Sequence, residues 1–345
     1  MTIRAYDHYI HTGDTAYGSG TTMQNIRNII LHCLVYGTGG VPAAGWTLEH
    51  DEGGPTGTFV LANGERDFFI CFAYRSAQIA NISIATSFEG VDSNGFIVGE
   101  AARSGAAPGF ASPFSWYADY FLGGGNSAAT SRAGWSMLAD ANSCALAFSA
   151  AGASFAAGPG LDTVSSSTRR YGGALSFGKT SLGYGHVSSG AGNSYYLHPA
   201  EGVMVLNYPQ TGLLIPSMDT VPDVTAGVDS IYSSSISSAS SADFVYEDQP
   251  TLPVEIYMQG SSSVGAGRLG FIRGLVQMPY IDKSIFPRHI LKALGMADED
   301  FDTMLMQDLS KFRLGSDGCK YAYAKLASGD TKRAQVFLTD NPLVW

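Results

Sequence analysis

The sequence carries little charge and no concentration of basic residues. Only 14% of its 345 residues are charged, and 20 basic residues stand against 30 acidic ones, which gives a net charge of −10. The adjacent basic pairs Arg169-Arg170 and Lys332-Arg333 are isolated from each other. Nucleic-acid-binding proteins need a basic stripe or patch. We therefore expect no direct nucleic-acid binding, and an anionic membrane surface is disfavoured for the same reason.

Long apolar runs and closely spaced cysteines are also missing. The chain has no apolar run of ~18 residues and does not open with a basic segment followed by an apolar one. We therefore expect neither a membrane span nor a secretory signal peptide. The four cysteines show no C-x-x-C spacing and define no disulfide: Cys33, Cys71, Cys144 and Cys319. Thiols within apolar runs are ordinarily buried and free, which predicts assembly in a reducing cytoplasm.

Glycine and aromatic residues, by contrast, are plentiful and interleaved. The chain has 42 glycines, 12% aromatic residues and 45% hydrophobic residues. Short alternating apolar runs between glycine-rich turns are typical of β-sandwiches and barrels. We predict a mainly β (α+β) fold with an antiparallel sandwich- or barrel-like core, an N-terminal amphipathic helix and a C-terminal helical region. The low charge further indicates a homo-oligomer, in which neighbouring copies cover much of the surface.

The stretch from Thr21 to Cys71 organises the N-terminal half. Apolar residues from Met23 to Leu34 recur at three- and four-residue steps, which predicts an amphipathic helix. Gly37 follows the last of them, where helices commonly end. Farther on, Asn63-Gly64 is a hairpin signal between strands expected at 58–61 and 67–74. Residues 78–86 alternate with period two, as in a half-buried strand.

Four segments are predicted along the chain. They are an N-terminal arm (1–20), a β-rich core with the N-terminal helix (21–229), a serine-rich linker or loop (230–242), and a C-terminal β/helical part (243–345). The arm either packs on a neighbouring subunit or forms a surface strand before the helix. The C-terminal part either stands alone or forms one domain with 21–229. Its helical region is expected at 286–312, and strand pairs are expected at 170–186 and 321–339.

Several short motifs follow one another in a recognisable order. The first are Cys33-Leu34, Gly37 to Gly40, Ala43 to Thr47, and the strands around Phe59 and Phe69; the later ones are Ala133-Gly134-Trp135 to Phe148, Arg170-Tyr171 to Gly178, Ile272 to Leu275 with Pro279-Tyr280, and Phe337 to Trp345. In this order the chain resembles a family of virion proteins from tailed bacteriophages. One departure is that Val276 to Pro279 stands where the family has a tighter Pro-Gly turn.

The resemblance implies a structural protein of the phage tail, baseplate or neck. Such a protein acts through self-association and contacts with other virion proteins, and is localised in the virion after assembly in the host bacterial cytoplasm. The alternative is a receptor-binding or glycan-degrading tail protein. Glycan cleavage needs two carboxyl groups ~5–10 Å apart, and the nearest acidic cluster, Asp298 to Asp302, stands at an expected helix start. Binding of a host surface glycan therefore ranks second.

No catalytic, cofactor-binding or metal-binding residue is predicted, and we do not expect an enzyme. Each group that could carry out catalysis or bind a ligand has a simpler interpretation as a turn, a core residue or an interface residue. The groups are Tyr17 to Gly20, His32-Cys33, His50-Asp51-Glu52, Asp92 to Gly95, the pair His186 and His198, and the tryptophans Trp46, Trp116 and Trp135.

Overall fold

The computed structural model describes about half of the chain, mostly as strands. The described residues are 2–7, 22–54, 57–76, 79–100, 114–117, 135–148, 173–189, 194–198, 202–206, 252–258, 267–278, 311–315, 318–324 and 335–345. Every pair of strands that they form is antiparallel. The predicted mainly β, antiparallel class is therefore confirmed.

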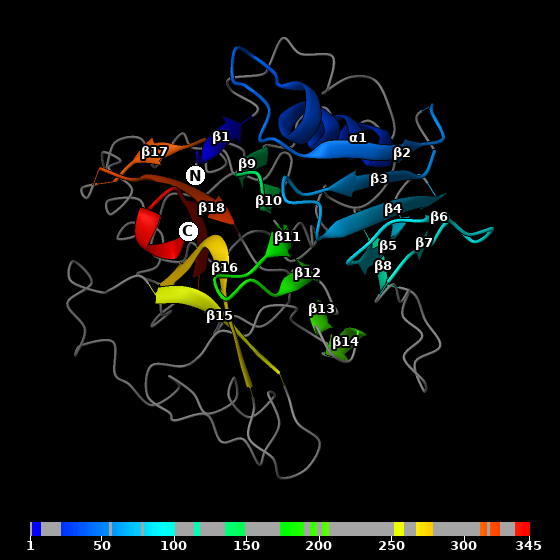
Figure 1. The fold of residues 1–345 in the computed structure, drawn as a ribbon. Helices are drawn as coiled ribbons and strands as arrows, with labels where there is room; N and C mark the ends of the chain where they lie inside the picture. Colours follow the sequence, from blue (N-terminus) through cyan, green and yellow to red (C-terminus); the bar gives the residue numbers. More distant parts are fainter. Residues whose placement is uncertain are drawn as a thin grey trace, which may run out of the picture.

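A seven-stranded central sheet runs through the middle of the molecule (Figure 1). In spatial order its strands are β1 (Arg4–Asp7), β9 (Trp135–Ala139), β10 (Ser143–Phe148), β11 (Gly173–Lys179), β12 (Gly185–Ser189), β13 (Ser194–His198) and β14 (Gly202–Leu206). From β9 to β14 each strand pairs with the next in the chain. The strand pair expected at 170–186 corresponds to β11 and β12.

The outer sheet packs on one face of the central sheet. Its spatial order is β2 (Thr47–Asp51), β3 (Phe59–Ala62), β4 (Phe69–Ser76), β5 (Ile79–Ala85) and β8 (Phe114–Tyr117). Residues alternate between its faces: Phe59 and Leu61 join a core shared with Met137 and Leu146 of the central sheet, whereas Val60 faces away. The hairpin predicted at Asn63-Gly64 is confirmed by the pairing of β3 with β4.

A small hairpin covers the far face of the outer sheet. Its strands are β6 (Gly90–Val91) and β7 (Ile97–Val98). Ile97 is buried with Val60, Phe69 and Cys71 in a second apolar cluster, against which Val91 packs. The outer sheet therefore has apolar cover on both faces.

Helix α1 (Thr22–Leu31) lies along the outer sheet near β2 (Figure 1) and continues as a π-helical turn, η1 (His32–Tyr36). Ile26, Ile30 and Leu34 point into the shared core. Gly37 ends the turn at φ +82°, and its backbone N–H donates to the His32 carbonyl. A glycine tolerates this backbone conformation without strain.

Part of the predicted N-terminal arm belongs to the central sheet. Residues 4–7 form its edge strand β1, which pairs with β9. Tyr6 is fully buried in the shared core, and its hydroxyl donates to the Pro42 carbonyl at 2.6 Å. Asp7 is also buried and accepts from the Phe312 backbone N–H at 3.2 Å. These four residues are therefore a core strand of the chain itself.

The C-terminal sheet packs on the opposite face of the central sheet, against β9, β10 and β11. Its spatial order is β15 (Leu252–Met258), β16 (Gly267–Met278), β19 (Gln335–Thr339), β18 (Lys320–Ala324) and β17 (Arg313–Leu314). The closing strand pair expected at 321–339 is confirmed as β18 and β19. A 3-10 turn, η7 (Pro342–Val344), ends the chain beside β16. The molecule thus has three stacked sheets, with the seven-stranded one in the middle.

Some expectations fall outside the described residues. They are the segment 8–20 of the arm, the serine-rich segment 230–242, and the helical region 286–312 apart from its last two residues. Within the described segments, no helix is long and apolar enough to cross a membrane.

Candidate functional site: a polar junction of three sheets

Asp140 stands at the turn between β9 and β10 and is completely buried. Its Oδ1 accepts hydrogen bonds of 2.7 Å from the backbone N–H groups of Asn142 and Ser143. Aspartate commonly closes turns in this way. A buried carboxylate is costly unless its oxygens have polar partners. Other elements of the fold therefore have to supply partners for Asp140.

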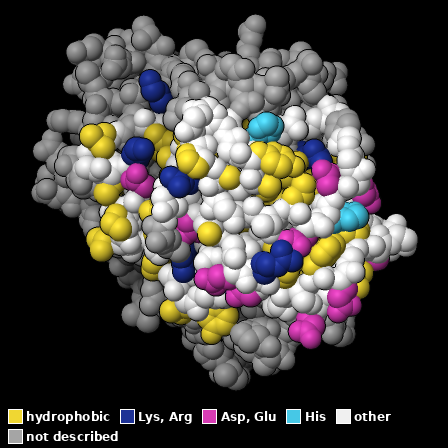
Figure 2. Space-filling model, turned by 45° about the horizontal axis from the view of Figure 1, so that its top comes forward, with side chains coloured by type: hydrophobic (Ala, Val, Ile, Leu, Met, Phe, Trp, Pro, Cys, Tyr) yellow, Lys and Arg dark blue, Asp and Glu magenta, His cyan; other side chains and the backbone are white. Residues whose placement is uncertain are grey.

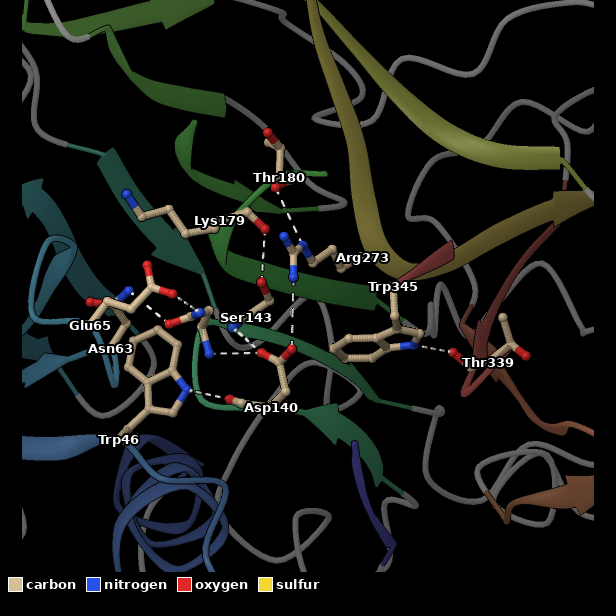
Figure 3. Close-up of polar contacts among 11 residues, drawn as sticks. Trp46, Asn63, Glu65, Asp140, Ser143, Lys179, Thr180, Arg273, Thr339 and Trp345 are labelled. Atoms are coloured by element: carbon tan, nitrogen blue, oxygen red, sulfur yellow. Dashed lines mark hydrogen bonds and ion pairs between the residues drawn. The ribbon is translucent and has the colours of Figure 1, made fainter. Parts of the chain in front are cut away.

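The outer sheet reaches this turn through Trp46. The indole Nε1 donates to the Asp140 carbonyl at 2.8 Å, and both groups are buried (Figure 3). The β3–β4 turn reaches it as well: the Gly64 N–H donates to the Ala141 carbonyl at 2.6 Å, and Asn63 Nδ2 donates to Asn142 Oδ1 at 3.1 Å. The turns of two sheets therefore interlock through main-chain and side-chain bonds.

The C-terminal sheet reaches the junction through Arg273 of β16. Its Nη1 lies 3.9 Å from Asp140 Oδ2, and its Nε donates to the Thr180 carbonyl at 3.3 Å (Figure 3). Ser181 adds two bonds to Phe271: its N–H donates to the Phe271 carbonyl at 3.1 Å, and its Oγ accepts from the Phe271 N–H at 3.0 Å. Residues 180 and 181, which open the β11–β12 turn, thus hold β16.

His186 on β12 is buried next to this junction. Its Nδ1 lies 3.0 Å from the Gly178 carbonyl oxygen, and its Nε2 lies 3.3 Å from Ser176 Oγ. These distances fit an Nδ1–H that donates to the carbonyl and an Nε2 that accepts from the hydroxyl. Gly178 has φ +111°, and a Cβ there would collide with the Asn142 carbonyl. Only glycine fits between the β9–β10 turn and the histidine strand.

Burial shifts the protonation of both acid–base groups. Desolvation raises the pKa of Asp140 above its ordinary value, and this effect outweighs the two backbone hydrogen bonds and the positive charge of Arg273, which lower it. Desolvation lowers the pKa of His186 to about 4, and Arg273 acts in the same direction. His186 is therefore neutral at pH 7.

The histidines singled out in the sequence are dispersed in the structure. His186 pairs across the strands with Tyr196, and His198 pairs with Gly202, so the two are not opposite each other. His32 makes an edge-to-face contact with Tyr36, and Cys33 beside it is buried in the core. His50 contacts the ring of Phe88. In the parts of the chain that the structure describes, no three His, Cys, Asp or Glu residues are grouped as a metal site.

The acidic groups singled out take part in local structure. Asp51 forms a bidentate ion pair with Arg27 at 2.6 and 2.7 Å. Glu52 accepts from the Thr58 N–H. Asp92 Oδ1 accepts from the backbone N–H groups of Asn94 and Phe96, which closes the β6–β7 turn.

Trp46 and Trp135 are buried, as core packing predicts. Trp116 lies in β8, opposite Ala80. Residues 17–20 lie outside the described segments.

Asp140 and Arg273 were not singled out by sequence reasoning, although both left a signal. Asp140 to Ser143 consists of turn-forming residues between two apolar runs. Arg273 is the one charged residue between Gly270 and Val276, and a lone cation in an apolar strand requires a buried partner. The identity of that partner depends on the stacking of the sheets, which local patterns do not contain.

No protein-family model, no curated protein and no solved structure matches the chain. The fold and the junction together define a protein of three antiparallel sheets that are joined by buried polar bonds.

Proposed function

We propose that the chain is a structural protein of a tailed-bacteriophage particle, placed in the tail, baseplate or neck, where it packs against copies of itself and other virion proteins. In this role its working surface is buried interface area, typically well over ~1,000 Å² for each contact. We also infer that the central and outer sheets, which share one core, constitute the predicted β-sandwich.

The observation that carries this proposal is that several of the motifs on which the resemblance to virion proteins rests lie together in the structure. Trp46, Asp140, Gly178 and Arg273 come from four of those motifs, separated by long stretches of sequence, and all four lie at the junction. A fifth motif ends at Trp345, whose indole lies against Gly274, the neighbour of Arg273. These motifs therefore build one structural scaffold.

The buried polar groups of the junction support a structural role. Asp140, Arg273 and Ser181 each connect elements from different sheets. Polar bonds of this kind fix one relative arrangement of packed layers, whereas apolar contacts alone tolerate sliding. A subunit that packs against copies of itself and other virion proteins benefits from such a defined arrangement.

The surface offers apolar side chains for association. Leu314 on β17 is 66% exposed and Leu343 on η7 is 84% exposed, and both belong to the C-terminal sheet or its closing turn. On the face seen in Figure 2, acidic and basic side chains are intermixed, with hydrophobic side chains between them. Such a mixed surface fits protein partners better than a polyanion.

The proposal is tested on purified particles of a phage that encodes this chain. Immunogold labelling with an antibody against the chain is expected to mark the neck, the tail or the tail tip. Absence of label from both intact and permeabilised particles would overturn the proposal. Glycan-binding and hydrolase assays on the isolated protein would then test the alternative tail-protein function.

Self-association is tested separately by sedimentation over a range of concentrations. Leu314→Lys and Leu343→Lys are expected to shift the protein towards smaller species, because each replaces an exposed apolar side chain proposed to contact a neighbouring subunit with a charged one. Val98→Lys, on the small hairpin far along the outer sheet, is the matched control: Val98 is 41% exposed and should tolerate the change. Equal effects of all three substitutions would contradict the assignment of this surface.

A further inference from the structure

The sequence contains two Asn-Gly pairs, Asn63-Gly64 and Asn94-Gly95. Such pairs are chemically fragile, because glycine has no side chain to shield its amide nitrogen. That nitrogen loses its proton and attacks the asparagine Cγ, with which it forms a new C–N bond. The bond from Cγ to the side-chain nitrogen breaks, and this nitrogen takes up a proton and leaves as ammonia. Water then opens the cyclic imide at either carbonyl and yields aspartate or isoaspartate.

The fold immobilises the amide of Asn63. Its Oδ1 accepts from the N–H groups of Asp67 and Phe68, each at 3.0 Å. Its Nδ2 donates to Asp67 Oδ1 at 2.9 Å and to Asn142 Oδ1 at 3.1 Å. The side chain is fully buried at the three-sheet junction. Attack by Gly64 would require the amide to break four hydrogen bonds at once.

Asn94 is placed very differently, at the exposed tip of the β6–β7 hairpin. Only its backbone is held, by the bond from its N–H to Asp92 Oδ1 at 2.8 Å. One bond, from the Gly95 N–H to the Asp92 carbonyl at 2.9 Å, restrains the attacking nitrogen. Each strand of this hairpin has two residues. Short hairpins open locally more readily than long strands. We therefore expect the Gly95 nitrogen to be released more often than that of Gly64, which donates to the Ala141 carbonyl at 2.6 Å.

We propose that Asn94-Gly95 is a site of spontaneous deamidation in the folded protein, that Asn63-Gly64 is protected, and that conversion of Asn94 uncovers the thiol of Cys71. The link to Cys71 is direct, because its Sγ lies 3.3 Å from the Gly95 carbonyl oxygen, to which it donates. The hairpin also closes the apolar cluster around Cys71.

Conversion would disturb this cover in two ways. Isoaspartate lengthens the backbone by one methylene between residues 94 and 95, which displaces the Gly95 carbonyl from Cys71. Either product also places a second carboxylate next to Asp92, whose Oδ1 closes the turn. In the intact protein, burial raises the pKa of the Cys71 thiol to about 12 and keeps it unreactive. The thiol should become reactive as the hairpin loosens.

The test compares the folded chain with the same chain in denaturant, both kept in mildly alkaline buffer and sampled over time. Peptide mapping by mass spectrometry measures conversion of each Asn-Gly pair separately. In denaturant both pairs should convert at similar rates. In the folded chain Asn94 should convert at least tenfold faster than Asn63. Equal rates in the folded chain, or no conversion of Asn94 while the denatured chain converts, would overturn the proposal.

Thiol labelling tests the second half of the proposal. Cys71 in aged wild-type protein should react with a maleimide several-fold faster than in fresh protein. Asn94→Gln is the matched control, since glutamine keeps the amide but cyclises far more slowly; aged protein of this variant should label like fresh protein. If converted wild-type chains label at Cys71 no faster than unconverted ones, the hairpin does not guard the thiol and that part is refuted.

Discussion

The indole of Trp46 and the backbone carbonyl of Asp140, 94 residues apart in sequence, are joined by a buried 2.8 Å hydrogen bond. This bond ties the entry of the outer sheet to the turn of the central sheet on which Arg273 also converges. The indole ring meets Phe68 and Phe177 edge-on at the same time. One side chain therefore combines apolar packing with a polar link between sheets.

Trp46→Phe separates these two contributions. The phenyl ring keeps much of the aromatic packing but leaves the Asp140 carbonyl without its donor, so the free energy of unfolding should fall by about 1–3 kcal/mol. Trp46→Ala also removes the ring and should cost about 3–5 kcal/mol. Urea titration measures both. Equal losses in the two variants would mean that the hydrogen bond, and not the ring, dominates.

Asp140 is tested by substitution with asparagine and with alanine. Asparagine retains an oxygen for the N–H groups of Asn142 and Ser143, whereas alanine leaves both N–H groups unsatisfied and should cost about 2–4 kcal/mol at neutral pH. The folded-state pKa of Asp140 is raised, so its contribution to stability is largest at low pH and declines as pH rises through that pKa. Relative to Asp140→Asn, the wild type should therefore be favoured by acid. A difference that does not change with pH would contradict the raised pKa.

His186 should govern part of the acid sensitivity. Its folded-state pKa of about 4 lies below the ordinary value of 6.5, so protons favour the unfolded chain between these two values. Stability is fully present above pH 6.5 and is lost as pH falls towards 4, by about 3 kcal/mol in all. His186→Gln cannot titrate and should show a flatter profile in denaturant titrations across this range. All other histidines remain in that variant, so an unchanged slope would exclude His186 as the cause.

Gly274 is required by both backbone conformation and space. Its φ is +75°, and a Cβ there would collide with the indole of Trp345. Gly274→Ala should therefore destabilise the protein well beyond the ~1 kcal/mol typical of alanine at a positive φ. Gly40→Ala isolates the backbone effect, because Gly40 has φ +80° and open space around it. Thermal unfolding of both variants measures the difference, and similar losses would show that Trp345 yields without cost.

Local patterns predicted the local elements well. The Asn63-Gly64 turn and the apolar runs on either side of it foretold β3 and β4, and the period-two run at 78–86 became β5. These features depend on neighbours in sequence, where turn chemistry and alternation act directly.

Local sequence patterns could not predict the polar junction of the three sheets. Asp140 and Arg273 lie on different sheets, and their proximity follows from how three layers stack. His186 was noted in the sequence, together with His198, as a possible receptor or metal contact in a loop. In the structure it lies in β12 and is buried, with its ring nitrogen 3.0 Å from the Gly178 carbonyl oxygen. A histidine in a short strand gives no local sign of which face another sheet will cover.

The position of β1 also sets an order of events during synthesis. Strands β9 to β14 each pair with a neighbour in sequence, and at most 24 residues separate two paired strands. β1 instead pairs with β9, between Asp7 and Ser136, and such distant closure is slow. At ~5–20 residues per second, an emerging chain would hold β1 without its partner for on the order of ten seconds. Tyr6, destined for the core, would spend that interval exposed. The first strand made in this sheet thus has to wait for the middle of the chain to leave the ribosome before it has a place to bind.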